Sequence, residues 1–313
     1  MPFSTVRSTG DVDAFRAAIR PANPEYLITG RGAFSATVTK IDLHRLQMQR
    51  LSESLARARR VCSTRADVYF PATPGTPMTS HGVEFGATDV GVRAPFSAEW
   101  NHVSGQSQTA VMSLAADDLA RLGRALVGHD VAVSPGSVLV SVSPPTQARL
   151  RRLHGAAVHL AHTAPEVITN PDAARGLEAA LAEAFVDCLA TGRPRAEGAA
   201  TRRHGAIIRR FRDLVEERPG EPLYLAEVCE AVGVSRRALH LCCHEHLGVG
   251  PKRYLTLRRL HLAREALRLG SPDKASVTDV ATQFGFWELG RFAVAYRSVF
   301  GETPSATLRS VPR

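Results

Sequence analysis

The chain has 313 residues, 44% of them hydrophobic, which is enough for two domains with ordinary cores and excludes a disordered chain. The net charge of +9 and the isoelectric point of about 9.9 favour a polyanionic partner. No run of about 18 apolar residues predicts a membrane span, and no apolar leader begins the chain. We therefore expect a cytoplasmic protein that does not bind membranes.

The N-terminal part of the chain has a pattern typical of β-strands. From about Tyr26 to Val142, Gly, Pro and Ser interrupt short and often alternating apolar segments such as EYLITG, FSATVTKIDL and GSVLVSV. One helix is predicted inside this region, at Ala115–Leu126. These segments predict a β-rich domain over residues 1–143.

After Pro145 the pattern becomes helical. Helices are predicted at 145–162 and 170–190, the second with Asn170 as its N-cap and Pro171 in its first turn. The stretch TGRPRAEGAA, residues 191–200, is small and polar and contains Gly and Pro, so it predicts a linker.

Residues 201–313 are predicted to form an all-helical domain, so the chain as a whole is expected to be α+β. The helices expected there cover about 201–217, 223–232, 235–247, 251–269, 276–284, 288–300 and a short piece after Pro304. Residues 196–313 hold 19 Lys and Arg against 13 Asp and Glu, so this part carries +6 of the total charge.

The C-terminal domain contains one small unit twice. EVCEAVGV at 227–234 matches DVATQFGF at 279–286. Each copy has a small residue where a second helix must approach, and a Gly that supplies the left-handed backbone of a sharp turn. The apolar positions of the helix that follows also match: Leu239, Cys243 and Leu247 in the first copy, Phe292, Tyr296 and Phe300 in the second. The repeat predicts two helix-turn-helix units.

Candidate metal and catalytic residues do not form a pattern. The five cysteines are odd in number and free of CxxC spacing, which predicts reduced thiols, with those near 242 packed in the core. His81, Glu84 and His102 are expected in loops or in the core. The sequence has no GxSxG, no phosphate-binding Gly loop and no HExxH. We therefore predict no catalytic residue, no metal site and no cofactor.

About residues 200–310 resemble the AraC/XylS family of bacterial transcription regulators. The resemblance rests on LAEVCEAVGVSRRALHLCCHEHLGVGPKRYLTLRRLHLAREAL followed by SVTDVATQFGFWELGRFAVAYRSVFGETPSATLR. It implies a seven-helix domain whose two recognition helices enter major-groove segments roughly 34–36 Å apart on one face of DNA. By position, it also implies that residues 1–143 sense a small-molecule effector and that the helical segment 144–190 forms a homodimer. A further similarity is to the ethanolamine-operon-regulator branch.

The resemblance assigns DNA contact to six residues at the first recognition helix. These residues are Ser235, Arg236, Arg237, His240, Leu241 and His244. Arg237, His240 and Leu241 match base-reading positions, and an Arg there suits bidentate contact to guanine. Arg236 is expected to contact phosphate, which positions a protein without specifying sequence. Ser235 is expected to begin the helix.

The second recognition helix departs from the family pattern. Leu289, Gly290 and Val294 match its base-reading positions but offer no side-chain hydrogen bonds, so they either touch thymine methyls or let the backbone approach. Glu288 either accepts from a cytosine amine or favours the helix N-terminus. Trp287 either packs in the turn or leans on the sugar-phosphate edge. We therefore expect the first helix to carry more of the hydrogen-bonded specificity.

Three further residues of this unit are assigned to the DNA backbone. Arg291 and Arg297 are expected to contact phosphates. Thr303 is expected to cap the short helix that begins at Pro304, and to aim backbone N–H groups at a phosphate.

The predicted function is a DNA-binding transcriptional regulator that is not an enzyme. Its expected partners are promoter DNA, RNA polymerase, a small-molecule effector and a second copy of itself. Activation is the family's commoner mode, and repression stays open. The rival is a DNA-targeted repair or modifying enzyme with a catalytic N-terminal domain, which would need an activated Cys and a four-thiolate zinc site. Nonspecific DNA compaction is a third reading, which a paired reading unit disfavours.

Overall fold

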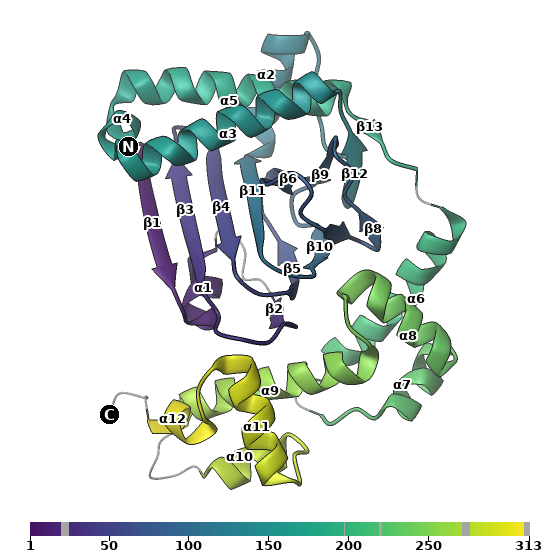
Figure 1. Cartoon of the computed structure of the whole chain (residues 1–313). Coiled ribbons are helices and arrows are strands. Elements are labelled where there is room, and N and C mark those ends of the chain that lie inside the picture. Colours follow the sequence, from purple (N-terminus) through teal and green to yellow (C-terminus); the bar gives the residue numbers. More distant parts are fainter. Residues whose placement is uncertain (20–24, 197, 219–220, 271–275, 310–313) are drawn as a thin grey trace.

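The structure is a computed structural model of the whole chain. It describes every residue except 20–24, 197, 219–220, 271–275 and 310–313. A β sandwich with helices on one side forms the N-terminal part, and a set of helices packed below it forms the C-terminal part (Figure 1). The expected α+β fold class is confirmed.

The described residues of the sandwich form two antiparallel sheets. The larger sheet has the order β1-β3-β4-β11-β6-β9-β12-β13, and the smaller has the order β2-β5-β10-β7-β8. The larger sheet consists of β1 (Phe3–Thr9), β3 (Ala36–Asp42), β4 (Gln47–Glu53), β6 (Ala66–Pro71), β9 (Asp89–Arg93), β11 (Ser107–Leu114), β12 (Ser137–Ser141) and β13 (Arg193–Pro194). The smaller sheet consists of β2 (Glu25–Ile28), β5 (Arg57–Cys62), β7 (Met78–Ser80), β8 (Val83–Glu84) and β10 (Ala98–Val103).

Helices cover the outer face of the larger sheet. These are α2 (Ala116–Val127), α3 (Pro144–Thr163), α4 (Pro165–Thr169) and α5 (Pro171–Thr191) (Figure 1). Strand β6 shows how both faces of this sheet are buried. Val68 and Phe70 pack with the helices in one apolar core, whereas Asp67 and Tyr69 alternate with them and face the smaller sheet. Ser143 and Asn170 cap α3 and α5 through their side chains.

The C-terminal part is helical wherever the structure describes regular elements. It consists of α6 (Ala199–Glu217), α7 (Leu225–Val232), α8 (Arg236–Leu247), α9 (Pro251–Leu269), α10 (Val277–Gln283), α11 (Leu289–Phe300) and α12 (Pro304–Arg309). Two apolar cores lie along it. The first half of α9 packs with α6, α7 and α8, and its second half packs with α10, α11 and α12. Helix α9 is therefore the common support of two small helical groups.

The helices predicted from the sequence occur within a few residues of the expected bounds. The segments singled out in the sequence did not mark the strands β1, β4, β5, β7, β9 and β13 or the helices α4 and α1 (Val12–Ala18), and β13 lies inside the predicted linker. Strand β1 lies at the edge of its sheet and is mostly exposed, so it lacks the apolar alternation that marks a strand. No helix in the described part of the chain is long and apolar enough to cross a membrane.

Candidate nucleic-acid interface

The first helix-turn-helix unit consists of α7, a turn at Gly233 and α8. Gly233 has a φ of +72°, which a glycine adopts without strain. Beyond the turn, the Val234 N–H donates to the Cys229 carbonyl at 3.0 Å. The Ser235 hydroxyl accepts from the Ala238 N–H at 3.2 Å, so Ser235 is the N-cap of α8. The angle between the two helices is fixed by these local contacts.

The buried face of α8 leaves the predicted DNA-contacting residues outside. Leu239, Cys242, Cys243 and Leu247 are fully buried against α6, α7 and α9. The exposed residues of α8 and of the residue before it are Ser235, Arg236, Arg237, His240, Leu241 and His244. Every residue assigned to DNA contact in this unit therefore lies on the accessible side of the helix.

A basic groove borders the exposed face of α8. It has a volume of about 850 Å³, and its basic lining residues are Arg236, Arg237, His240, His244, Lys252 and Arg253. The rings of His240 and His244 lie 4.4 Å apart. Partial burial and then the neighbouring His240 lower the pKa of His244, so it is neutral at pH 7. Four permanent positive charges, from three Arg and one Lys, thus line the groove.

The second unit repeats this geometry with α10, a turn at Gly285 and α11. Gly285 has a φ of +72°, and the Phe286 N–H donates to the Ala281 carbonyl at 2.9 Å. Phe286 fills the angle between the helices, with its ring 4.9 Å from that of Phe292. The Arg259 guanidinium lies over the Phe286 ring at 5.0 Å and donates to the Gly285 carbonyl at 3.3 Å. This turn is thereby anchored to α9.

The accessible face of α11 differs in chemistry from that of α8. Trp287 and Val294 are each 73% exposed, and Leu289 is 42% exposed. The indole of Trp287 thus lies outside the turn. The structure does not support packing of Trp287 in the turn, which was one of the two alternatives for this residue. The Glu288 carboxylate accepts from Arg291 Nη1 at 2.9 Å and does not cap the backbone of α11. These two opposite charges form a pair with each other.

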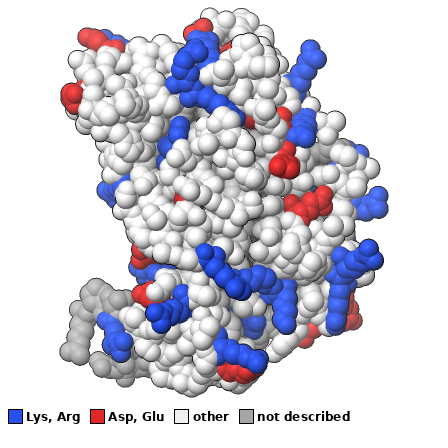
Figure 2. Space-filling view, viewed as in Figure 1, with Lys and Arg blue, Asp and Glu red and all other residues white. Residues whose placement is uncertain are grey.

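The remaining assigned residues lie along α11 and at the start of α12. Arg297 and Gly290 are exposed on α11, and Arg291 is exposed beside Glu288. The Thr303 hydroxyl accepts from the Ala306 N–H at 3.2 Å, so Thr303 caps α12 as predicted from the sequence. Its contact with a phosphate stays a prediction. In Figure 2, several Lys and Arg side chains lie across the lower, helical part of the visible face.

Strand β10 forms a wall between the sandwich and the helices. Because side chains alternate along a strand, Glu99 and Asn101 point into the sandwich, whereas Trp100 and His102 point outward. Trp100 is 2% exposed and belongs to the core formed with α6, α7, α8 and α9. The Arg212 guanidinium of α6 lies over its ring at 4.4 Å.

The same strand reaches the last turn of α8. His102 Nε2 lies 3.2 Å from the Glu245 carbonyl oxygen. A Cβ added to Gly248 would lie 2.8 Å from His102 Nδ1, so the His102 ring packs directly against the backbone of Gly248. The first recognition helix is therefore in direct contact with the N-terminal sheet, which the sequence did not predict.

The second unit is tied to the sandwich through α1 and α9. Arg268 Nη1 donates to Asp13 at 2.6 Å. Arg264, nearly buried, lies between Asp11 at 3.6 Å and Glu302 at 3.2 Å. Because these contacts join α1 to α9 and to the turn before α12, both helical groups are fixed to the N-terminal part in this arrangement.

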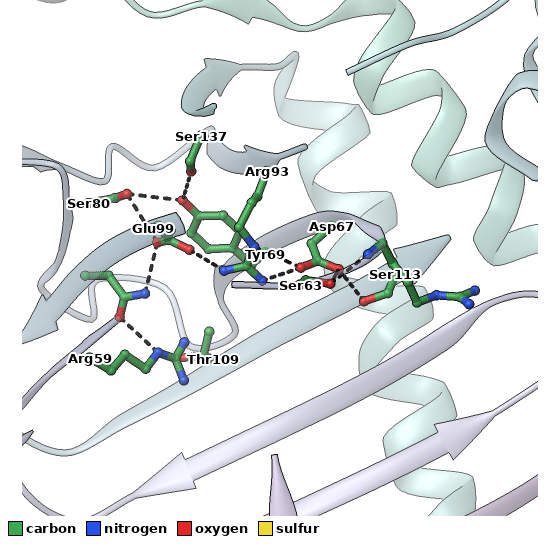
Figure 3. A network of polar contacts seen from close by, with 12 residues as sticks. Arg59, Ser63, Asp67, Tyr69, Ser80, Arg93, Glu99, Thr109, Ser113 and Ser137 are labelled. Atoms are coloured by element: carbon green, nitrogen blue, oxygen red, sulfur yellow. Dashed lines mark hydrogen bonds and ion pairs between the residues drawn. The ribbon is translucent and has the colours of Figure 1, made fainter. Parts of the chain in front are cut away.

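The space between the two sheets is filled by buried polar groups (Figure 3). Arg93 is held between Asp67 and Glu99, with Nη1 2.9 Å from the Glu99 carboxylate. Burial, followed by the Glu99 charge, raises the pKa of Tyr69 well above its usual value, so its hydroxyl stays protonated. Burial, followed by Arg57, lowers the pKa of Arg59 to about 10. A cavity of about 20 Å³ remains, which is room for about one water molecule.

The thiols that the enzyme alternative requires are not brought together. Cys62 is exposed, and Cys188 is buried, which together with the nearby Asp187 raises the Cys188 pKa to about 12. Among the residues that the structure describes, no group of three or more His, Cys, Asp or Glu is placed to hold a metal ion. Burial therefore keeps the Cys188 thiol protonated at neutral pH.

Comparisons with known proteins concern the C-terminal third. Residues 228–310 match the family described as a helix-turn-helix domain. The chain is 40% identical over 106 residues to the probable thc operon regulatory protein of Rhodococcus erythropolis. The matched region covers 34% of this chain and 32% of that protein. The chain is also 40% identical over 95 residues to the XylDLEGF operon transcriptional activator of Pseudomonas putida, covering 30% of each chain. The chain thus spans about a third of the length of these relatives.

Two solved structures also match this chain. The AraC-like transcriptional activator CuxR is 16% identical, with a TM-score of 0.43, over 84% of this chain and 96% of that chain. A probable AraC family transcriptional regulator from Rhodopseudomonas palustris is 30% identical, with a TM-score of 0.31, over 34% of this chain and 98% of that chain.

Proposed function

Since this chain belongs, through its C-terminal domain, to the AraC/XylS family of regulators, we propose that it is a sequence-specific DNA-binding regulator of transcription. The observation that carries the proposal is the pair of helix-turn-helix units on one supporting helix. Helix α9 has 19 residues and is therefore about 28 Å long. This length is comparable to the roughly 34–36 Å between major-groove segments on one face of DNA.

In this proposal α8 enters one major-groove segment. Arg237 and His240 read base edges by hydrogen bonds, and Leu241 contacts bases through its apolar side chain. Arg236 and His244 lie beside them on the exposed face, and Arg236 contacts phosphate. Support comes from the exposure of these side chains on a helix whose opposite face is fully buried.

Helix α11 enters the next segment, and its cations contact the DNA backbone. Arg297 is free of the Glu288–Arg291 pair and lies one turn beyond Val294, where it meets phosphate. Thr303, at the start of α12, contacts a phosphate of the same strand. The excess of basic residues in this third of the chain supports the electrostatic part of the binding.

The N-terminal part senses a small-molecule effector in this proposal. The sandwich interior has little free volume, whereas a cavity of about 550 Å³ lies between the two parts of the chain, lined by α1, β2, α6 and α9. That volume is in the usual range for small-molecule sites. An effector bound there would contact Tyr26 on one side and Tyr254 on the other, and would shift the population of docked arrangements.

The proposal has three further parts: the mode of regulation, the contact with RNA polymerase, and the homodimer. Activation is favoured because relatives that match the C-terminal domain are described as transcriptional activators. Contact with RNA polymerase follows from that mode. A homodimer forms through the outer faces of α3 and α5, whose inner faces are occupied by the larger sheet.

The proposal is tested by selecting bound fragments from genomic DNA with the purified full-length chain at about 0.15 M salt. We expect a shared site with two short elements about one turn apart. The double variant Arg237→Ala, His240→Ala is expected to lose this selectivity. The control Arg121→Ala, an exposed Arg on α2 outside both the DNA interface and the proposed dimer surface, is expected to keep it. Indiscriminate recovery by the unaltered chain would exclude sequence-specific regulation.

A further inference from the structure

The second helix-turn-helix unit exposes large apolar side chains where a soluble surface would carry polar ones. Trp287 and Val294 are each 73% exposed, and Leu289 is 42% exposed. They surround Gly290 at the first turn of α11, opposite the buried residues Phe292 and Tyr296. Clustered exposure of this kind is typical of a contact surface.

No charged group stands free at the first turn of α11. Gly290 has no side chain, and the Glu288 carboxylate pairs with Arg291 at 2.9 Å. Arg297 lies two turns into the helix, whereas recognition helices contact base edges with their N-terminal residues. The part of α11 best placed to meet bases is therefore apolar.

The internal repeat shows how this differs from the first unit. Helices α8 and α11 both have 12 residues and begin 53 positions apart, at Arg236 and Leu289. The position of Arg237 in α8 is thus occupied by Gly290 in α11, and that of Leu241 by Val294. Both units keep an exposed aliphatic residue, but α11 has no Arg at the position that Arg237 occupies in α8.

We propose that α11 recognises the 5-methyl groups of pyrimidines in the major groove, with Val294 as its main specificity-determining residue and Trp287 beside it. This inference rests on the proposed function, and it names what the second half of the operator must contain. Thymine is the DNA base that carries a methyl on its major-groove edge, and apolar side chains contact that methyl. Cytosine lacks the methyl and presents an amine instead, for which α11 has no unpaired carboxylate.

The size of the effect follows from the area of one methyl group. Burying one such group changes binding about fourfold, so two contacted thymines would contribute about fifteenfold. Loss of a guanine contact at Arg237 is expected to be larger, at about fivefold to 150-fold. The two elements of the operator should therefore differ in kind: guanine in the first, and thymine in the second.

The test uses the selected duplex with thymidines replaced one at a time by deoxyuridine, which removes the methyl alone. We expect about fourfold weaker binding for each contacted position in the second element. Replacing such a thymine–adenine pair with cytosine–guanine should weaken binding, and 5-methylcytosine at that position should recover part of the loss. The full-length chain is used throughout, and binding is measured by fluorescence anisotropy.

The variant Val294→Ser should bind the thymine and deoxyuridine duplexes equally well. Its matched control, Val167→Ser, changes an exposed Val on α4 and should keep the fourfold difference. Because Val294 is largely exposed, both variants are expected to keep the melting temperature of the unaltered chain.

The outcomes separate this inference from the function on which it rests. If no specific duplex is selected at all, the proposed function fails. If a specific duplex is bound but deoxyuridine has no effect at any position in the second element, methyl recognition is overturned and the regulator stands. If Val294→Ser leaves DNA binding intact but abolishes transcriptional activation, the apolar surface contacts a protein instead, which also overturns the inference.

Discussion

The chain has two tryptophans, and their surroundings predict opposite effects of the same substitution. Trp100 lies on strand β10 of the sandwich, but its side chain is buried in the helical core. The Arg212 guanidinium lies over its ring, and the centre of the Tyr254 ring lies 6.5 Å from the centre of the Trp100 ring. Trp100→Ala is expected to lower the free energy of unfolding by about 3–5 kcal/mol, the usual result of deleting a buried aromatic side chain. Because this side chain joins the two parts, the helices should then unfold at lower urea than the sandwich.

The assay is urea denaturation followed by far-ultraviolet circular dichroism, with Trp287→Ala as the matched control. Trp287 is 73% exposed, so its loss should leave the urea transition unchanged and weaken DNA binding. In each single variant the remaining tryptophan can be followed by fluorescence, blue-shifted for Trp100 and red-shifted for Trp287. If Trp100→Ala unfolds in the same single transition as the unaltered chain, the shared core described above is incorrect.

Three other predictions concern DNA binding, the packing of His102 on Gly248, and the dependence of stability on pH. Arg237→Ala should weaken specific DNA binding by about 1–3 kcal/mol and relax selectivity at one base pair. Competition among DNA sites that differ at single base pairs measures both effects. A uniform loss of affinity across all sequences would assign Arg237 to a phosphate contact instead. Gly248→Ala should destabilise the folded chain more than Gly128→Ala. Both glycines have a positive φ, but only a Cβ at Gly248 would crowd the His102 ring. Equal urea midpoints for the two variants would contradict the contact between Gly248 and His102. Burial above all, then the nearby histidines, lowers the pKa of His246 to about 4. As the pH falls, the unfolded chain therefore binds a proton at this imidazole before the folded chain does. The stability of the folded chain is lost as the pH falls from about 6.5 toward 4. Urea midpoints measured between pH 7.5 and 4.5 should show this loss, and His246→Gln should reduce its slope; an unchanged slope would contradict burial of a neutral imidazole.

The helical domain could be predicted closely from the sequence because its signals are local. A Gly at each turn, Gly233 and Gly285, and an apolar residue at every fourth position are enough to identify a helix-turn-helix unit. The repeat then provided an internal check, because a pattern that occurs twice in register is seldom accidental. The exposed side chains of the two recognition helices followed directly from that register.

The contacts between the two parts could not be predicted in this way. An alternating strand shows that Trp100 lies on one face and Glu99 on the other, but not which element covers each face. Buried Arg59 and Arg93 look like surface residues in the sequence, because their partners Asn101 and Asp67 come from strands distant along the chain. Strand alternation alone therefore does not reveal the polar interior of the sandwich or the wall formed by β10.

The central claim is that the two helix-turn-helix units read one face of DNA at a separation fixed by α9. It is tested most directly by hydroxyl-radical footprinting of the full-length chain on its selected site. The account predicts two protected windows on the same face, centred about 10 base pairs apart, with protection of the first lost in Arg237→Ala, His240→Ala. Inserting about half a turn of DNA, 5 base pairs, between the elements should abolish simultaneous protection. A single window, or two windows whose spacing can change freely, would contradict the account.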